Sequence, residues 1–335
     1  MKLNISDPVI TSHHFYALPL SIIGSDPKLS SWIYSEFIQI HTSRNREDEK
    51  AEIRLYNKDN EMFMYEPLHE AIIAPKRLVY GESVIDVYKA LLDSEQYIYD
   101  FVDKYYIKSF GFNGHFIHDL LLYGYDDDGQ VFWGYAYNGI KLSHFKIPYR
   151  EYIEAYNSEY MQTRHHITVL YRKKDSEYHV SITRIGDLFK DYLNGVNTYA
   201  RESLHKVLLY KPKFGLKVYD ELKYILEYAC EYRIDINIPD IYCLYDHKKF
   251  MAERVRYLNE AKYVMCSPDL QEKFDRIYHS GRILSLLVLK LNQTKFQNPE
   301  DCKAFRRRID IVKDMEEEAY TKYYEYNRLA FESVL

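Results

Sequence analysis

Cysteine is scarce in this chain, and no cysteine occurs before residue 230. The sequence of 335 residues contains four, which are Cys230, Cys243, Cys266 and Cys302. No two of them are close in sequence, so they predict neither a disulfide framework nor a thiolate metal site. We expect four mostly buried thiols in a reducing cytoplasm. The first two thirds of the chain therefore contain no thiol that could act as a nucleophile.

Glycine and proline are also scarce, and the chain has no excess of basic charge. Only 12 Gly and 10 Pro occur, which argues against long linkers and disorder. The net charge of -5 provides no basic field, so we predict neither a nucleic-acid nor a membrane partner. The N-terminus lacks the apolar segment of a signal peptide, and the most apolar run, 283–291, is about half the length that crosses a bilayer. These features favour a cytoplasmic protein.

The common cofactor motifs are absent as well. The sequence has no Walker loop, no Gly-x-Gly-x-x-Gly, no Gly-x-Ser-x-Gly and no His-Glu-x-x-His, so we predict no cofactor. Adjacent histidines project in different directions, so neither the pair His13 and His14 nor the pair His165 and His166 by itself predicts a metal site. The run 126–128 of aspartates lacks the ligand spacing of a calcium loop and is typical of a solvated turn.

The periodicity of the sequence changes near residue 185. Short strands and helices are expected before it, among them a helix that starts near Ala17, because Pro19 is tolerated only in a first turn. Strands are also expected on both sides of a turn at 173–177. After residue 185 the period is that of helices, with two start signals at Ser267-Pro268 and Asn298-Pro299. We predict a mixed α/β domain at 1–185 and an all-helical domain at 186–335.

The abundant residue is tyrosine, with 36 copies. Tyrosine combines apolar area with a hydroxyl, and half-buried packing is its usual role. A tyrosine-lined cleft is the functional alternative. The composition alone does not decide between the two.

The segment 114–134 contains the most informative pattern. His118 opens one expected strand, an acidic turn ending in Asp128-Gly129 follows, and a second strand comes after it. A histidine at the start of a strand can present one ring edge to a cleft and move protons there. Its neighbour Asp119 should point to the opposite face of an ordinary strand and could not orient it. A core histidine that begins a buried strand is the alternative interpretation.

This segment resembles the histidine motif of C39-type peptidases and the N-terminal domain of the butirosin-biosynthesis protein H family. The preceding residues 101–106 are similar to the strand that this family has ahead of its histidine. The resemblance, carried by residues 10–185, implies an α+β protein, with a papain-like cysteine-peptidase-type domain followed by a helical domain. It implies specialised-metabolite biosynthesis and an acyl or peptidyl carrier protein as partner.

The chain departs from the family at two positions. The nucleophilic cysteine should open the first helix, where Tyr16 or Ala17 stands, and the orienting acid should lie within 134–138, where only Asn138 could serve. Two hypotheses follow. In the first, His118 is the catalytic residue, a general base acting on a carrier-bound acyl group, with Tyr16 and Tyr135 binding substrate. In the second, the protein is a non-catalytic binding or accessory protein that has lost its nucleophile.

Two basic segments are weaker candidates for a carrier-protein dock. One is the helix that contains His247 and Arg254, and the other is the cluster 306–308. Acidic carriers would bind such faces by charge complementarity. A solvated helix face is the more common meaning of such charge runs.

Overall fold

The computed structural model describes residues 1–44, 51–56, 65–75, 83–139, 141–161, 166–202 and 211–333. The chain forms two compact units, one from Met1–Ser30 with Glu61–Tyr178 and the other from Ser31–Asn60 with His179–Leu335. The mixture of helix and sheet followed by a helical C-terminal region agrees with the α+β class. The division differs from a single boundary near residue 185, because residues 31–60 group with the helical region.

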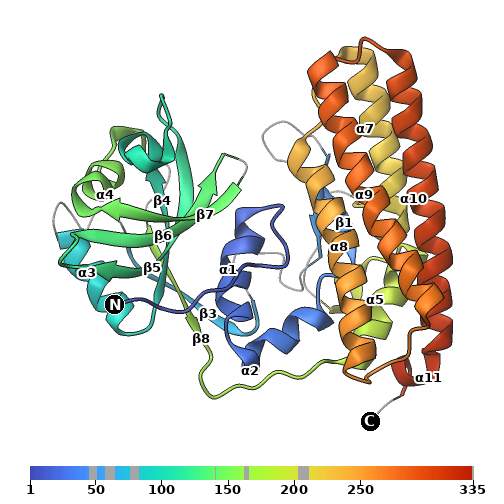
Figure 1. The fold of residues 1–335 in the computed structure, drawn as a ribbon, viewed down its shortest axis with the longest axis horizontal. Coiled ribbons are helices and arrows are strands. Elements are labelled where there is room, and N and C mark those ends of the chain that lie inside the picture. The colour runs from blue at the N-terminus through green and yellow to red at the C-terminus, as the bar shows by residue number, and fades with distance from the viewer. Residues whose placement is uncertain are drawn as a thin grey trace. The chain divides into compact units, whose positions relative to one another are not determined.

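The first unit is built on an antiparallel sheet of six described strands in the order β3-β8-β4-β5-β6-β7 (Figure 1). The strands are β3 (Leu68–Pro75), β4 (Tyr97–Asp103), β5 (Ile117–Asp126), β6 (Val131–Asn138), β7 (Lys141–Pro148) and β8 (His166–Arg172). The hairpin predicted around the Asp-Gly turn is confirmed as β5 and β6. The strand expected after residue 177 is wrong: Tyr178 bonds through its N–H to Lys28 and through its hydroxyl to Glu66, not to β8.

Helices cover both faces of this sheet. They are α1 (His14–Gly24), α3 (Ser83–Asp93) and α4 (Tyr149–Tyr156), and the short helix α2 (Pro27–Ser30) packs against α1. One face packs a hydrophobic core of Ile98, Val102, Leu120 and Leu122 with residues of α3 and α4. Because side chains alternate along a strand, Asp119 and Leu121 point to the opposite face. That face contacts α1, which packs against β5, β6 and β8.

The first helix begins earlier than the position of its proline suggests. Helix α1 starts at His14 and contains Pro19 in its interior, so the expected start near Ala17 is wrong. Proline has no N–H to donate to the carbonyl four residues before it, which is that of Phe15. The hydroxyl of Tyr65 donates to the Phe15 carbonyl at 2.7 Å instead. Because Tyr65 bonds the carbonyl that Pro19 cannot, the helix tolerates Pro19. The first turn of the helix therefore begins at His14.

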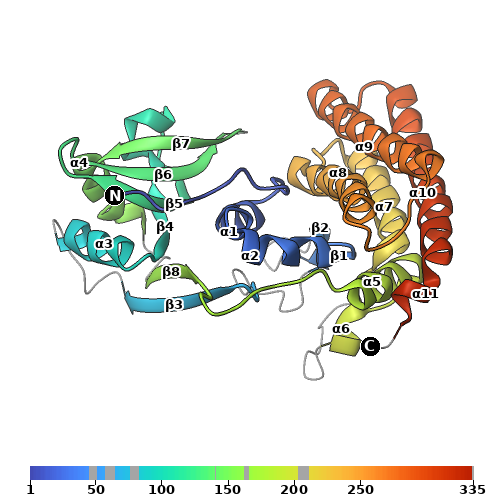
Figure 2. The ribbon, with the colours of Figure 1, turned by 60° about the horizontal axis from the view of Figure 1, so that its bottom comes forward.

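The second unit is a helical bundle with one small hairpin. The hairpin joins β1 (Ile40–Arg44) to β2 (Ala51–Leu55). The helices are α5 (Ile182–Asn194), α6 (Thr198–Glu202), α7 (Val218–Tyr232), α8 (Ile238–Glu260), α9 (Pro268–Thr294), α10 (Pro299–Tyr326) and α11 (Arg328–Phe331). Figures 1 and 2 show α7, α8, α9 and α10 side by side. Both predicted start signals are confirmed, because the Ser267 and Asn298 side chains cap α9 and α10.

The interior of the bundle contains charged groups. Lys248 on α8 and Glu316 on α10 form an ion pair of 2.8 Å, and both side chains are fully buried. Arg254 is buried too, and its guanidinium donates to the carbonyls of Tyr34 and Glu36. Lys248 and Arg254 therefore point into the bundle, whereas Arg256 of the same helix is exposed, and the carrier-protein dock stays a prediction. No helix among the described residues combines the length and the apolar character that a membrane span requires.

Candidate functional site

Three side chains of the first unit meet at the beginning of β5 and the beginning of α1. The carboxylate of Asp119 is buried, with 1% of its side chain exposed. Oδ2 lies 3.1 Å from Nε2 of His14, and Oδ1 lies 2.6 Å from Nδ1 of His118. The two imidazole rings are edge to face, with 5.0 Å between their centroids. We call His14, His118 and Asp119 the His–Asp–His cluster.

The sheet register explains why a tyrosine joins this cluster. Tyr99 on β4 pairs with Leu121 on β5, two residues beyond Asp119, so Tyr99 and Asp119 share the face that contacts α1. The Tyr99 hydroxyl donates to Oδ2 of Asp119. Since Oδ2 also faces His14, the orientation of the carboxylate is held from two elements, the neighbouring strand and the first helix.

One expectation about His118 needs correction. The ring edge to face with His118 belongs to His14, and Tyr16 contacts the rings of His13 and Phe15, so substrate binding by Tyr16 stays a prediction. Asp119 was expected to be out of reach of His118, which is wrong because the carboxylate and the ring are 2.6 Å apart. His118 is the second residue of its strand, where the alternation of an ordinary strand is not yet imposed from both sides.

The cluster is strongly polar despite its burial. Burial raises the pKa of Asp119, but the charges of His14 and His118 and a hydrogen bond from Tyr99 outweigh that effect, so the pKa is lowered overall. Lys104, whose ammonium donates to the carbonyl of Tyr137 at 3.1 Å, is buried as well. Burial lowers the pKa of Lys104 to about 8, against the opposing effect of the Asp119 charge. Because the pKa of Asp119 is lowered, its carboxylate is ionised at neutral pH.

The cluster reaches the surface at both imidazoles. The exposed fraction is 24% for the His14 side chain and 27% for the His118 side chain, although Nδ1 of His118 is buried. The Phe116 ring stacks on the His118 ring with a centroid distance of 5.1 Å. Nδ1 of His118 and Oδ1 of Asp119 do not have the alignment of a hydrogen bond, and neither has another hydrogen-bond partner in the described part of the chain. The cluster thus contains two close polar atoms that do not satisfy each other.

Sequence reasoning missed a second imidazole on the same loop. Nδ1 of His115 lies 2.6 Å from Oδ2 of Asp103, which is fully buried and also accepts from Ser158 Oγ at 2.7 Å. The His115 ring stacks on Tyr160 at 3.8 Å and is 31% exposed. This pair has the geometry in which a carboxylate holds an imidazole in one orientation. Its signal in the sequence was only the spacing of two histidines, His115 and His118, before the strand.

The other predicted site residues, Tyr135 and Asn138, have partners outside the cluster. Tyr135 donates to Oδ1 of Asp7 at 3.2 Å, and its ring lies 4.6 Å from that of His144. Burial and the Asp7 charge raise its pKa, so it is a neutral hydroxyl. Asn138 is exposed and pairs with Lys141 at the end of the β6–β7 ladder. Residues 134–138 contain no acid, and the carboxylate 2.6 Å from the His118 ring is that of Asp119 on β5 itself.

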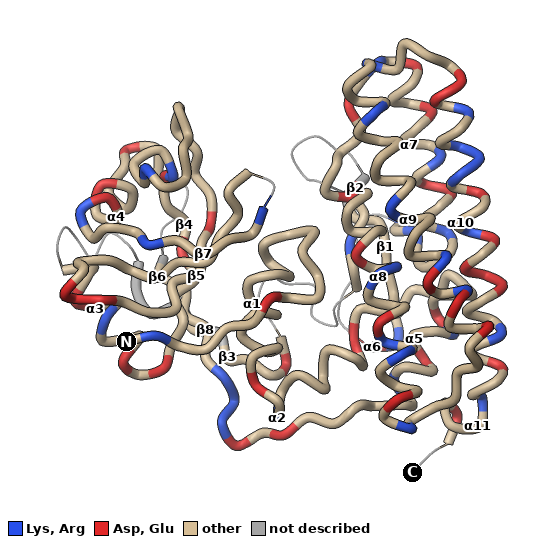
Figure 3. Tube along the Cα trace, in the orientation of Figure 1, with Lys and Arg blue, Asp and Glu red and all other residues tan. Residues whose placement is uncertain are grey.

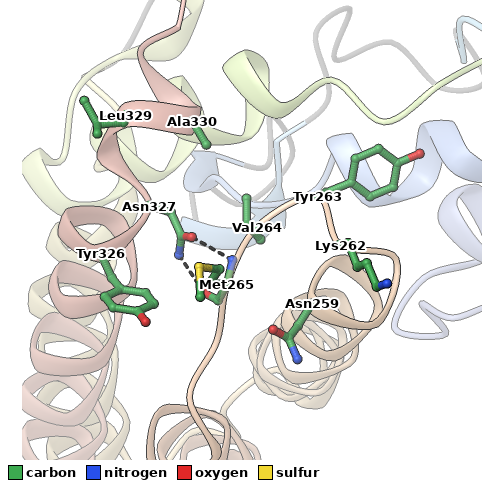
Figure 4. A pocket seen from close by; sticks show the side chains of 9 residues that line it. All are labelled: Asn259, Lys262, Tyr263, Val264, Met265, Tyr326, Asn327, Leu329 and Ala330. Carbon is green, nitrogen blue, oxygen red and sulfur yellow. Dashed lines mark hydrogen bonds between the residues drawn. The ribbon is translucent and has the colours of Figure 1, made fainter.

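A cavity of about 390 Å³ lies in the second unit, between the α8–α9 connection and the end of α10 (Figure 4). The side chain of Asn327 crosses its floor and bonds the backbone N–H and carbonyl of Met265. Lys262 is the charged residue of its lining. A lining with one cation and no acid, thiol or imidazole offers none of the usual protein ligands of a transition metal, so the cavity is the weaker candidate.

The surface of the bundle is equally uninformative about partners. Acidic and basic residues alternate along α9 and α10, as Figure 3 shows. Arg306, part of the second basic cluster proposed as a dock, forms an ion pair with Glu227 of α7. The four cysteines are free thiols, all in the second unit. No protein-family model and no curated protein matches this chain.

Proposed function

We propose that the first unit is a papain-like module that acts on acyl or peptidyl groups held on a carrier protein, in the biosynthesis of a specialised metabolite. The observation that carries the proposal is the His–Asp–His cluster. It lies where the first helix begins beside the strand that starts with His118. In a papain-like site the nucleophile opens that helix and the histidine opens that strand. His14 occupies the place of the cysteine.

The chemistry that fits this cluster needs no protein nucleophile. The acyl group arrives as a thioester, so an incoming amine can attack its carbonyl carbon directly. The C–N bond forms, the C–S bond breaks, and the proton that the amine loses is taken up at the cluster and passed to the departing thiolate. His118, with 27% of its side chain exposed, would take the proton of the incoming amine. The buried carboxylate of Asp119 stabilises the positive charge that develops on the ring.

The proposal is tested by turnover of a carrier-bound acyl thioester with an amine acceptor. We expect His118→Ala to lower the rate by about 10²- to 10⁴-fold, the usual worth of positioned proton transfer. His144→Ala is the matched control, because its ring contacts Tyr123 and Tyr135 and not the cluster. Equal rates for the wild type and His118→Ala would remove His118 from the mechanism. Binding of the acylated carrier without turnover would instead establish the non-catalytic binding protein.

A further inference from the structure

We propose that the His–Asp–His cluster binds a divalent transition-metal ion, with zinc as the best fit. The donors are Nε2 of His14, Nδ1 of His118 and Oδ1 of Asp119. One ligand atom from each of the three residues lies within 4.8 Å of the other two. Two ligands that are each about 2.1 Å from a tetrahedral zinc ion are roughly 3.4 Å apart. Nδ1 of His118 and Oδ1 of Asp119 are 2.6 Å apart, which is below that spacing, and Nε2 of His14 lies 3.1 Å from Oδ2, the neighbouring oxygen of the same carboxylate.

A second observation points to a ligand independently of the spacing. Nδ1 of His118 and Oδ1 of Asp119 are buried and have no hydrogen-bond partner in the described part of the chain. A buried polar atom without a partner costs about 1–3 kcal/mol. The cluster therefore leaves unsatisfied the same nitrogen and oxygen that a cation would bind, and Asp119 is almost completely buried. A bound ion would satisfy both lone pairs at once.

The residues around the donors also suit a metal site. The hydroxyl of Tyr99 occupies Oδ2 of Asp119, which fixes the carboxylate and leaves Oδ1 for the ion. Such outer contacts orient the ligands of a metal and are worth about 10- to 100-fold in affinity. The neighbouring ammonium of Lys104 donates to the Tyr137 carbonyl and lies over the Phe110 ring.

The donor set indicates which ion binds and what it does. Calcium and magnesium prefer oxygen ligands, whereas two imidazoles with one carboxylate suit zinc and its first-row neighbours. Three protein ligands leave a fourth position open, which is typical of catalytic and not of structural zinc. Resting here on the proposed function, the ion would activate the incoming nucleophile or polarise the acyl carbonyl in place of His118, which would then act as a ligand and no longer as the general base. The sequence predicted no metal because His13 and His14 were considered as a pair, whereas His14 pairs with residues about 100 positions later.

The inference is tested with the full chain, stripped with a chelator and titrated with Co(II) and then Zn(II). We expect one Co(II) per chain, with the intense visible absorption of a four-coordinate site, and displacement by Zn(II). His14→Gln, His118→Ala and Asp119→Asn should each weaken binding at least 100-fold, and Tyr99→Phe about 10- to 100-fold. The control is His13→Asn, next to a ligand but stacked on Phe15 at 4.9 Å.

Each outcome decides the inference. Circular dichroism of every variant shows whether weakened binding comes from a lost ligand or from unfolding. Absence of stoichiometric binding, or binding that survives all three ligand substitutions, overturns the inference. Turnover by metal-free protein would overturn its catalytic part and leave the proposed function standing. Cluster-dependent binding without turnover would support the metal site and refute the proposed function.

Discussion

The buried carboxylate of Glu316 gives the sharpest stability prediction. It accepts hydrogen bonds from Tyr192 at 2.6 Å and Tyr219 at 2.7 Å, both on Oε2, and from Tyr320 at 3.2 Å on Oε1. The ammonium of Lys248 completes its partners at 2.8 Å. Both charged side chains have no exposed area. The substitution Glu316→Ala would remove an ion and four interactions from the centre of the bundle.

The expected loss follows from the groups that the substitution leaves behind. An unpaired buried charge costs about 3–5 kcal/mol, and each hydroxyl without an acceptor costs about 1–3 kcal/mol. The sum of these costs is an upper bound on the lost stability. Burial lowers the pKa of Lys248, so the lysine can lose its proton once Glu316 is gone and no buried charge is then left unpaired. We expect a loss of about 4–6 kcal/mol for Glu316→Ala, which is comparable to the whole stability of many domains. Glu316→Gln keeps acceptor oxygen and should lose about 3 kcal/mol.

The measurement is urea unfolding at pH 7, followed by circular dichroism and by amide hydrogen exchange in α8 and α10. Exchange is needed because a chain of two units need not unfold in one step. Glu317→Gln is the matched control: the residue is adjacent on α10 but exposed, so a change within about 0.5 kcal/mol is expected. A loss below about 1 kcal/mol for Glu316→Ala would refute the assignment of Glu316 as the centre of a buried polar network.

Two further stability predictions concern the second unit. Burial raises the pKa of Asp240 to about 7, against the opposing charge of Arg54 at 3.8 Å. Its folded pKa lies above the unfolded value, so the contribution of Asp240 to the free energy of unfolding is fully present below about pH 4 and falls by roughly 3–4 kcal/mol as the pH rises to about 7. Asp240→Asn should flatten this part of the unfolding free energy against pH, and an unchanged slope would contradict it. Gly215→Ala should lose more than about 2 kcal/mol in urea unfolding, because φ is +52° and a Cβ would lie 2.0 Å from the Tyr192 carbonyl oxygen. Its control in the first unit is Gly139→Ala, with φ of +65° and open space, which should lose only about 1 kcal/mol, and equal losses would refute the steric argument.

Local features of the fold could be predicted from the sequence. Capping side chains at Ser267 and Asn298, and the Asp-Gly turn after β5, act within a few residues, so a sequence pattern reports them directly. The place of Pro19 in the first helix was predicted wrongly. The Tyr65 hydroxyl, which bonds the carbonyl that Pro19 cannot, lies 46 positions away in the sequence (65 minus 19).

The site was predicted only in part, for the same reason. His118 was found from its place at the start of a strand, but His14 was not, because its partners are about 100 residues away in sequence. The partners of Lys248 and Arg254, which are Glu316 and the carbonyls of residues 34 and 36, were not predicted because they are set by tertiary packing. Burial of a charge cannot be inferred from a helical pattern when its partner is on another helix.

The most direct test of the account is anomalous X-ray diffraction at the zinc edge from crystals of the full chain grown with zinc. The account predicts one strong peak about 2.0–2.2 Å from Nε2 of His14, Nδ1 of His118 and Oδ1 of Asp119. A peak at other residues, or no peak at the cluster under conditions in which the protein is folded, would contradict it.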